Sequence, residues 1–125
     1  MNLLLDTHVL LWWLENNRSL SKAARSAIAQ PSNLVFVSAV NALEITIKKA
    51  LGKLKAPDNL EDEITANRFQ SLPVTIAHAL AVGKLPPHHN DPFDRLLIAQ
   101  ADVEGLTIVT HDARIKKYGV LYIDA

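Results

Sequence analysis

The chain has 125 residues, which suits one domain large enough to bury a core. Its 49% hydrophobic and 21% charged residues are typical of a soluble globular protein. Because 13 basic residues balance 13 acidic ones, no global charge points to nucleic acid, and the absence of cysteine excludes disulfides and thiolate zinc sites. The leucines near the start follow no basic segment, so they do not resemble a signal peptide. The longest apolar stretch, residues 9–14, is too short to cross a bilayer. We therefore expect a cytoplasmic protein without a membrane segment.

Strand-like and helix-like segments alternate through the first half of the chain. The leucines at residues 3–5 predict a short buried strand, and an apolar helix is expected at 8–15. A second helix should begin at residue 19 and end at the turn residues 31–33. The valine-rich run 34–37 predicts a strand covered on both faces, followed by a helix over 38–51 that Ser38 caps and Gly52 ends.

The second half continues the alternation after a polar loop at 53–59. Asp91 as N-cap and Pro92 at the first helical position mark the clearest helix start. The expected elements, in order, are a weak helix ending near 69, a short strand 73–75, a helix 77–83, a loop 86–90, a helix 91–104, a strand 106–110, a helix 112–117 and a strand 120–123. This order favours one α/β domain, residues 1–125, with a mainly parallel sheet between helices.

Four acidic residues stand where strands give way to helices: Asp6, Glu44, Asp94 and Asp112. In a doubly wound sheet, strand carboxyl ends and adjoining helix starts converge on one crevice. Four carboxylates there would repel one another unless a cation neutralised them. The pattern therefore predicts a carboxylate-lined site for a divalent metal, although Asp6 and Asp112 could also be helix caps and Asp94 could simply favour a helix dipole.

Glu44 is the acid that capping explains least well. By helical spacing it shares one face with apolar residues that we expect to be buried, namely Val40, Ile47 and Leu51. A carboxylate carried inward with them is costly unless it is paired or bound to metal. Lys48 lies four residues on, but Leu43 and Ile45 crowd the apolar side of the helix, so we expect no helical partner for Glu44.

Hard oxygen ligands without cysteine select Mg²⁺ or Mn²⁺ over zinc. Such an ion can activate water and stabilise charge on a phosphodiester. Thr7 and Thr110 are expected to support the site by orienting a carboxylate or a water, unless they serve only as local caps.

Four segments of the chain together resemble the PIN-domain family, and within it the VapC-type toxins of bacterial toxin–antitoxin pairs. They are Leu4–Trp12, Val37–Ile45, Asp91–Ala101 and Leu106–Asp112, in the family's order and spread over nearly the whole chain. By position, Asp6, Glu44 and Asp94 match the family's three core acids, and Asp112 matches the fourth, more variable one. Asp91 falls one helical turn early and is interpreted as a cap. His111 stands where many relatives carry arginine.

The resemblance implies a three-layer α/β/α fold and a Mg²⁺- or Mn²⁺-dependent endoribonuclease that hydrolyses RNA. It also implies a homodimer that a cognate antitoxin, encoded beside it, inhibits. Two alternatives keep the fold: a degenerate PIN-like module that only binds protein, and a PIN nuclease of RNA processing that is not a toxin. A histidine/aspartate phosphohydrolase, suggested by His88 and His89, is disfavoured by the strands, and a receiver domain by the lone acid after the first strand.

Two surface features bear on partners. Lysines near the end of the Glu44 helix could guide an RNA backbone toward the acids, or could simply be a solvated helix end: Lys48, Lys49, Lys53 and Lys55. The apolar residues Val9 to Leu14 exceed what one face of a short helix buries. We expect Trp12 and Trp13 to complete the core, with a protein-binding groove as the alternative.

Overall fold

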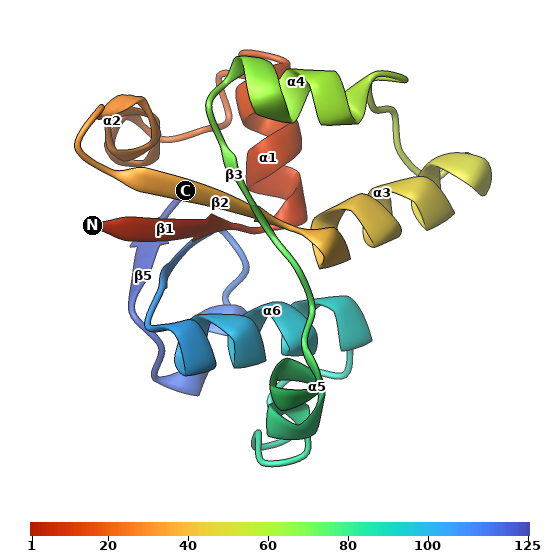
Figure 1. The fold of residues 1–125 in the computed structure, drawn as a ribbon, viewed down its shortest axis with the longest axis vertical. Coiled ribbons are helices and arrows are strands. Elements are labelled where there is room, and N and C mark those ends of the chain that lie inside the picture. Colours follow the sequence, from red (N-terminus) through yellow and green to blue (C-terminus); the bar gives the residue numbers. More distant parts are fainter.

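The computed structural model describes residues 1–125 and has five parallel strands in one sheet, in the order β3-β2-β1-β4-β5. Strand β1 lies at the centre of the sheet, between β2 and β4 (Figure 1). The strands are β1 Asn2–Leu5, β2 Leu34–Ser38, β3 Gln70–Leu72, β4 Thr107–Thr110 and β5 Tyr122–Asp124. The expected parallel sheet is confirmed.

Helices cover both faces of this sheet, so the fold has three layers (Figure 1). Helices α1, α2 and α4 lie on one face, and α6 lies on the other with α5 beside it. The bounds are α1 Thr7–Leu14, α2 Lys22–Ala29, α3 Ala39–Ala50, α4 Leu60–Ala66, α5 Ile76–Val82 and α6 Pro92–Glu104, with a 3₁₀ turn, η1, at Ile115–Tyr118. No helix is long and apolar enough to pass through a membrane.

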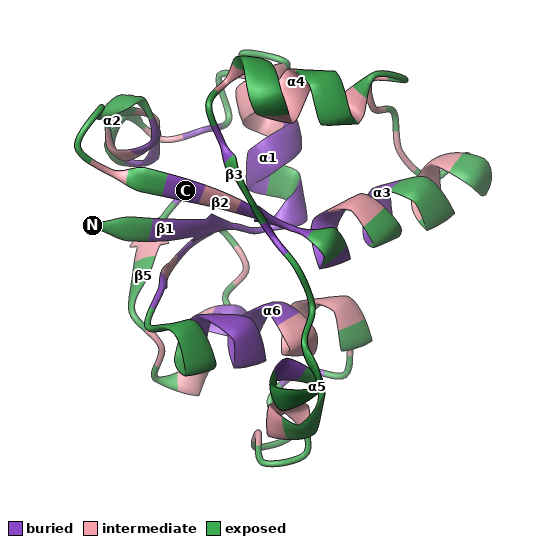
Figure 2. Cartoon of the chain, viewed as in Figure 1, coloured by how far each residue is buried: buried purple, intermediate pink, exposed green.

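The leucines of β1 show why the sheet needs both helical layers. Side chains alternate along a strand, so Leu3 and Leu5 enter the core under α1 and α2, whereas Leu4 enters the core under α6. All three are completely buried, and Figure 2 shows the same burial along β1. A run of leucines without polar alternation is thus the mark of a strand covered on both faces.

Helix starts follow the expected capping chemistry. The Ser38 hydroxyl accepts a hydrogen bond from the Val40 amide, and the Asp91 carboxylate accepts from the amides of Phe93 and Asp94. Both predicted N-caps are confirmed. Gly105, at φ 68°, ends α6 in the left-handed conformation that glycine adopts most readily.

Three expected elements are displaced. The strand expected at 73–75 is instead Gln70–Leu72, because Pro73 has no amide to donate and its carbonyl accepts from Gln100 instead. The helix expected at 112–117 is only the turn η1, since the Asp112 carboxylate accepts the Arg114 amide 2.8 Å away and competes with helical bonding. The last strand is Tyr122–Asp124 rather than 120–123.

Candidate active site

Asp6 lies at the carboxyl edge of the sheet, directly after β1, and is 5% exposed. Its Oδ1 accepts the Val9 amide at 2.8 Å, so it caps α1. Its Oδ2 accepts a short hydrogen bond from the hydroxyl of Thr110, the last residue of the adjacent strand β4. Asp6 therefore caps α1 and is also one of the four acids expected in the site.

Glu44 projects from α3 into the same region and is 4% exposed. The Thr7 hydroxyl donates to its Oε1 at 2.6 Å, and the Lys48 ammonium pairs with its Oε2 at 2.6 Å. Asn41 donates to the Thr7 hydroxyl and to the Leu5 carbonyl, both at 3.1 Å. Thr7 thereby links α1 to α3 and orients Glu44.

Two expectations about this helix are wrong. Ile47 and Leu51 are 40% and 62% exposed, so they do not bury the face that carries Glu44. The buried residues of α3 all lie in its first seven positions, and the helix runs away from the sheet from the end of β2 (Figures 1 and 2). The expected lack of a helical partner is also wrong, because a lysine four residues on reaches the carboxylate of Glu44.

Asp94 and Asp112 form a more open part of the site. Asp94 lies in the first turn of α6, where the Asp91 cap fixes its backbone amide. Asp112 follows β4, and the Arg114 guanidinium holds both of its oxygens, at 3.2 and 3.1 Å. The side chains of Asp94 and Asp112 are 16% and 24% exposed.

His89 joins these two acids, and sequence reasoning missed it as a site residue. Its Nε2 lies 2.7 Å from Asp94 Oδ2 and 3.6 Å from Asp112 Oδ2. The imidazole is buried although it comes from the loop between α5 and α6. Its position two residues before a helix cap, and five before an expected site acid, was the available signal.

The carboxylates influence one another electrostatically. Burial raises the pKa of Asp94 to about 6, and the charges of Asp91 and Glu44 add to the increase, whereas the hydrogen bond with His89 lowers it. Burial also raises the pKa of Asp6, against the hydrogen bonds from Thr110 and Val9, and the Asp112 charge raises it further. Burial acts to raise the pKa of Asp112 too, but the hydrogen bonds and charge of Arg114 lower it overall.

This donor set fits a hard divalent cation. Every acid supplies oxygen. Burial raises the pKa of Asp6 and of Asp94, and repulsion from neighbouring carboxylates raises both further. A cation among them would relieve that repulsion. The assignment of Asp6, Glu44, Asp94 and Asp112 as ligands and catalysts nevertheless stays a prediction, as do the supporting roles of Thr7 and Thr110.

The other residues singled out in the sequence lie around this site. Trp12 and Trp13 pack partly buried against the core, as expected, and the Trp13 indole donates to Asn67 at 2.9 Å. His111 is exposed and faces Asp124, at 3.5 Å, rather than the acids. Lys49 pairs with the exposed Asp58. Lys53 is exposed after α3 ends.

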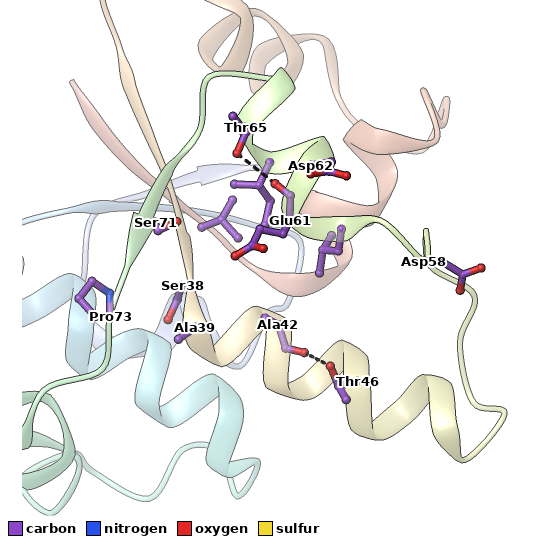
Figure 3. Close-up of a pocket in the computed structure, with 13 residues that line it drawn as sticks. Ser38, Ala39, Ala42, Thr46, Asp58, Glu61, Asp62, Thr65, Ser71 and Pro73 are labelled. Atoms are coloured by element: carbon purple, nitrogen blue, oxygen red, sulfur yellow. Dashed lines mark hydrogen bonds between the residues drawn. The ribbon is translucent and has the colours of Figure 1, made fainter.

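A groove of about 870 Å³ lies apart from the acids, between α3, α4 and β3. Figure 3 shows Ala39, Ala42 and Thr46 along one side, and Glu61, Asp62 and Thr65 along the other. None of the four site acids lines it. The four acids at the sheet edge are thus separate from this groove.

Known proteins share both the sequence pattern and the fold. Residues 3–121 match the PIN domain. Ribonuclease VapC22 of Mycobacterium tuberculosis is 30% identical over 118 residues, which cover 92% of this chain and 90% of that protein. Among solved structures, VapBC2 from Rickettsia felis, bound to a DNA fragment from its promoter, matches 99% of this chain and 98% of that chain, with TM-score 0.74 and 15% identity. VapBC-1 from nontypeable Haemophilus influenzae gives the same coverage, with TM-score 0.66 and 21% identity.

The two solved structures bear on the fold alone, and they agree with the three-layer arrangement described above. The sequence match adds the family, because it spans every strand that contributes to the acidic edge and all four acids. This chain therefore belongs to the PIN-domain family.

Proposed function

We propose that this chain is a metal-dependent endoribonuclease and the toxin of a toxin–antitoxin pair. The observation that carries the proposal is the set of mutually interacting acids at the carboxyl edge of the sheet in a PIN domain. Asp94 and Asp112 lie together beside His89. In addition to burial, the charge of Glu44 raises the pKa of Asp94, and the charge of Asp112 raises that of Asp6. The similarity to Ribonuclease VapC22 supports RNA as the substrate.

Asp6, Glu44, Asp94 and Asp112 would hold the ion, and their oxygen ligands favour Mg²⁺ or Mn²⁺. When bound, a divalent cation would stabilise charge that develops on a phosphodiester and make water a stronger acid. The protein supplies fixed ligands: Thr7 orients Glu44 and Thr110 orients Asp6 through buried hydroxyls. Carboxylates held in this way need little rearrangement when the reaction begins.

Basic residues near the end of α3 would contact the RNA backbone. Lys49 and Lys53 are the better candidates, since Lys48 pairs with the buried Glu44, whereas the partner of Lys49 is the exposed Asp58 and Lys53 is exposed. Because phosphate contacts release counterions, binding through these lysines should weaken as salt increases.

We also propose that the chain forms a homodimer and that an antitoxin protein inhibits it in the cytoplasm. The neighbouring solved structures are named as VapBC complexes, and one is named a toxin–antitoxin complex from Klebsiella pneumoniae. An exposed apolar stripe on α3 supports a protein partner: Leu43, Ile47 and Leu51.

Light scattering should report a dimer, and Leu51→Glu should weaken it. The control Leu121→Glu, which changes another exposed leucine, beside β5, should leave the dimer intact. A monomeric wild type would contradict the dimer.

RNA cleavage and growth arrest together test the main proposal. Purified protein should cleave RNA with Mg²⁺ or Mn²⁺ and stop when EDTA is added. Expression in a bacterium should halt growth, and Asp94→Asn should restore it. Cleavage without growth arrest would favour a PIN nuclease that is not a toxin. A folded protein that cleaves no RNA with either ion would favour a module that only binds protein.

A further inference from the structure

His89 is the buried histidine that contacts two of the proposed ligands. Its Nε2, an oxygen of Asp94 and an oxygen of Asp112 all lie within 4.8 Å of one another, so the three could by themselves surround a metal ion. Two roles are therefore open to the imidazole. It could offer the lone pair of Nε2 to a metal, or it could use an Nε2 proton to hold a carboxylate.

The second ring nitrogen decides between these roles. Nδ1 accepts a hydrogen bond from the Asp91 amide at 3.3 Å, so it carries no proton. In a neutral imidazole the proton must then be on Nε2, which lies 2.7 Å from Asp94 Oδ2 and donates to it. A metal on Nε2 would require the proton to move to Nδ1, where it would face the Asp91 N–H, donor against donor.

The loop that carries His89 is held in place by the residue next to Asp94. The Arg95 guanidinium donates to the main-chain carbonyl of His89 at 3.3 Å, and to those of three other residues before it, Val82, Leu85 and Pro86. The Tyr118 hydroxyl also reaches the His89 carbonyl, at 3.5 Å. The backbone under the imidazole is therefore held in place, and the Asp91 amide on Nδ1 holds the ring with Nε2 toward Asp94.

We propose that His89 is a positioning residue: as the Nε2–H tautomer it donates to Asp94 Oδ2, directs the other oxygen of Asp94 toward the cation, and stays outside the metal's own ligands. Asp94 Oδ1 is suited to this task because no side chain or amide of the protein donates to it, whereas each oxygen of Asp6 and Glu44 already accepts a hydrogen bond. The inference builds on the proposed metal-dependent function and adds the residue that orients one ligand.

Two variants separate the two ring nitrogens. In His89→Gln the amide nitrogen can occupy the place of Nε2 and still donate to Asp94. In His89→Asn the shorter side chain can accept the Asp91 amide, as Nδ1 does, but cannot reach Asp94. Titration calorimetry with Mn²⁺ should show affinity within about threefold of wild type for Gln and a loss of about 10- to 100-fold for Asn, the range expected when a ligand's support is removed.

Spectroscopy tests the same inference without RNA. Long-range ¹H–¹⁵N NMR of the metal-free wild type at pH 8 should show His89 protonated at Nε2 and not at Nδ1. Electron spin echo spectra of bound Mn²⁺ should lack the coupling of a directly coordinated nitrogen. A proton on Nδ1, a coordinated nitrogen, or unchanged Mn²⁺ affinity in His89→Asn would each overturn the inference. If wild type binds Mn²⁺ with the expected tautomer but cleaves no RNA, the proposed function fails and the role of His89 stands.

Discussion

Asp6 and Glu44 are held mainly by neutral donors, whereas Asp94 and Asp112 are held by an imidazole and a guanidinium. In the inner pair, the threonine hydroxyls come from the end of β4 and the start of α1, and both carboxylates are almost fully buried. In the outer pair, His89 and Arg114 come from segments outside the regular helices and strands, and both carboxylates are partly exposed. The inner pair is part of the core's own hydrogen bonding, while the outer pair is held by one buried imidazole and one exposed guanidinium.

This difference predicts where the site is robust. Buried hydrogen bonds between fixed elements keep their geometry in salt, because solvent ions screen them little. Exposed ion pairs contribute little to stability and weaken in salt. We therefore expect the loss of a hydroxyl that holds the inner pair to reduce stability, and the loss of the guanidinium that holds the outer pair to reduce it much less.

The largest effect should follow from Asp6→Asn. Losing this charge removes a proposed ligand, and we expect RNA cleavage to fall at least about 100-fold, the scale of losing one electrostatic contact in a transition state. Since burial already raises the pKa of Asp6, a neutral side chain should leave the metal-free melting temperature equal or higher. Cleavage assays beside thermal melts in EDTA measure both.

The matched control is Asp102→Asn, which neutralises an exposed aspartate on α6. It should change neither cleavage nor melting. Full cleavage by Asp6→Asn would remove Asp6 from the proposed ligands. A melting temperature of Asp6→Asn several degrees below that of wild type would show that the charge of Asp6 stabilises the fold.

Thr110→Val tests the hydroxyl that holds the inner pair. The hydroxyl donates to Asp6 and accepts the Asp112 amide at 3.0 Å, so valine leaves buried polar atoms without partners. Such a loss costs about 1–3 kcal/mol in the free energy of unfolding, and Thr110→Ser, which restores the hydroxyl, should recover most of it. Urea unfolding measures the difference.

Arg114→Ala provides the contrast in the outer pair. The Arg114 side chain is 61% exposed, so its loss should change the unfolding midpoint much less than Thr110→Val does. If Arg114→Ala is the more destabilising of the two, the distinction between inner and outer pairs is wrong.

The pH dependence of stability reports the outer pair. The Asp94 carboxyl has an ordinary pKa of 3.8, and in the folded protein its pKa is about 6. Between these values the folded protein keeps a proton that the unfolded chain has lost, so the free energy of unfolding should fall as pH rises from about 4 to about 6. A pKa difference of this size corresponds to roughly 1–3 kcal/mol. Denaturation in EDTA across this range, with Asp94→Asn as comparison, is the measurement. A variant that keeps the full slope would show that other groups cause it.

Much of this architecture could be predicted from sequence because local chemistry determines it. The leucines of β1 predicted a short buried strand, the run 34–37 predicted a strand covered on both faces, and Ser38 and Asp91 predicted two helix starts. The order of acids along alternating strands and helices was enough to expect Asp6, Glu44, Asp94 and Asp112 near one sheet edge. These features depend on short-range patterns and on the geometry of parallel sheets.

What could not be predicted depends on contacts between distant segments. The position of the His89 backbone depends on Arg95 binding the carbonyls of this loop, a contact that periodicity does not predict. The exposure of Ile47 and Leu51 follows from α3 extending past the sheet, which the helical pattern alone does not reveal. Apolar spacing identified a face of the helix but not how much of that face the sheet would cover.

Of these predictions, the loss of the Lys48 charge should have the smallest effect, and its effect on metal affinity tells most about the inner pair. Its ammonium pairs with Glu44, and that hydrogen bond raises the pKa of Lys48, with further increases from the charges of Glu44, Asp91 and Asp94. It therefore lies close enough to the acids to neutralise part of their charge. A divalent cation that enters the site must compete with this ammonium for Glu44.

Lys48→Met should therefore tighten Mn²⁺ binding by a fewfold, because Glu44 loses a competing cation while methionine retains most of the side chain's apolar contact. Lys49→Met is the matched control: Lys49 is adjacent on the same helix but pairs with the exposed Asp58, so its loss should leave Mn²⁺ affinity unchanged. Calorimetric titrations of both variants measure the Mn²⁺ affinities.

RNA cleavage at several salt concentrations tests the other role considered for these lysines, which is binding of the RNA backbone. If Lys48 instead serves to bind RNA, Lys48→Met will raise KM and reduce the salt dependence of cleavage while Mn²⁺ affinity stays at the wild-type value. Weaker Mn²⁺ binding in Lys48→Met would mean that the ammonium organises Glu44 for the metal rather than competing with it, and the inner pair would then depend on a charged group as the outer pair does.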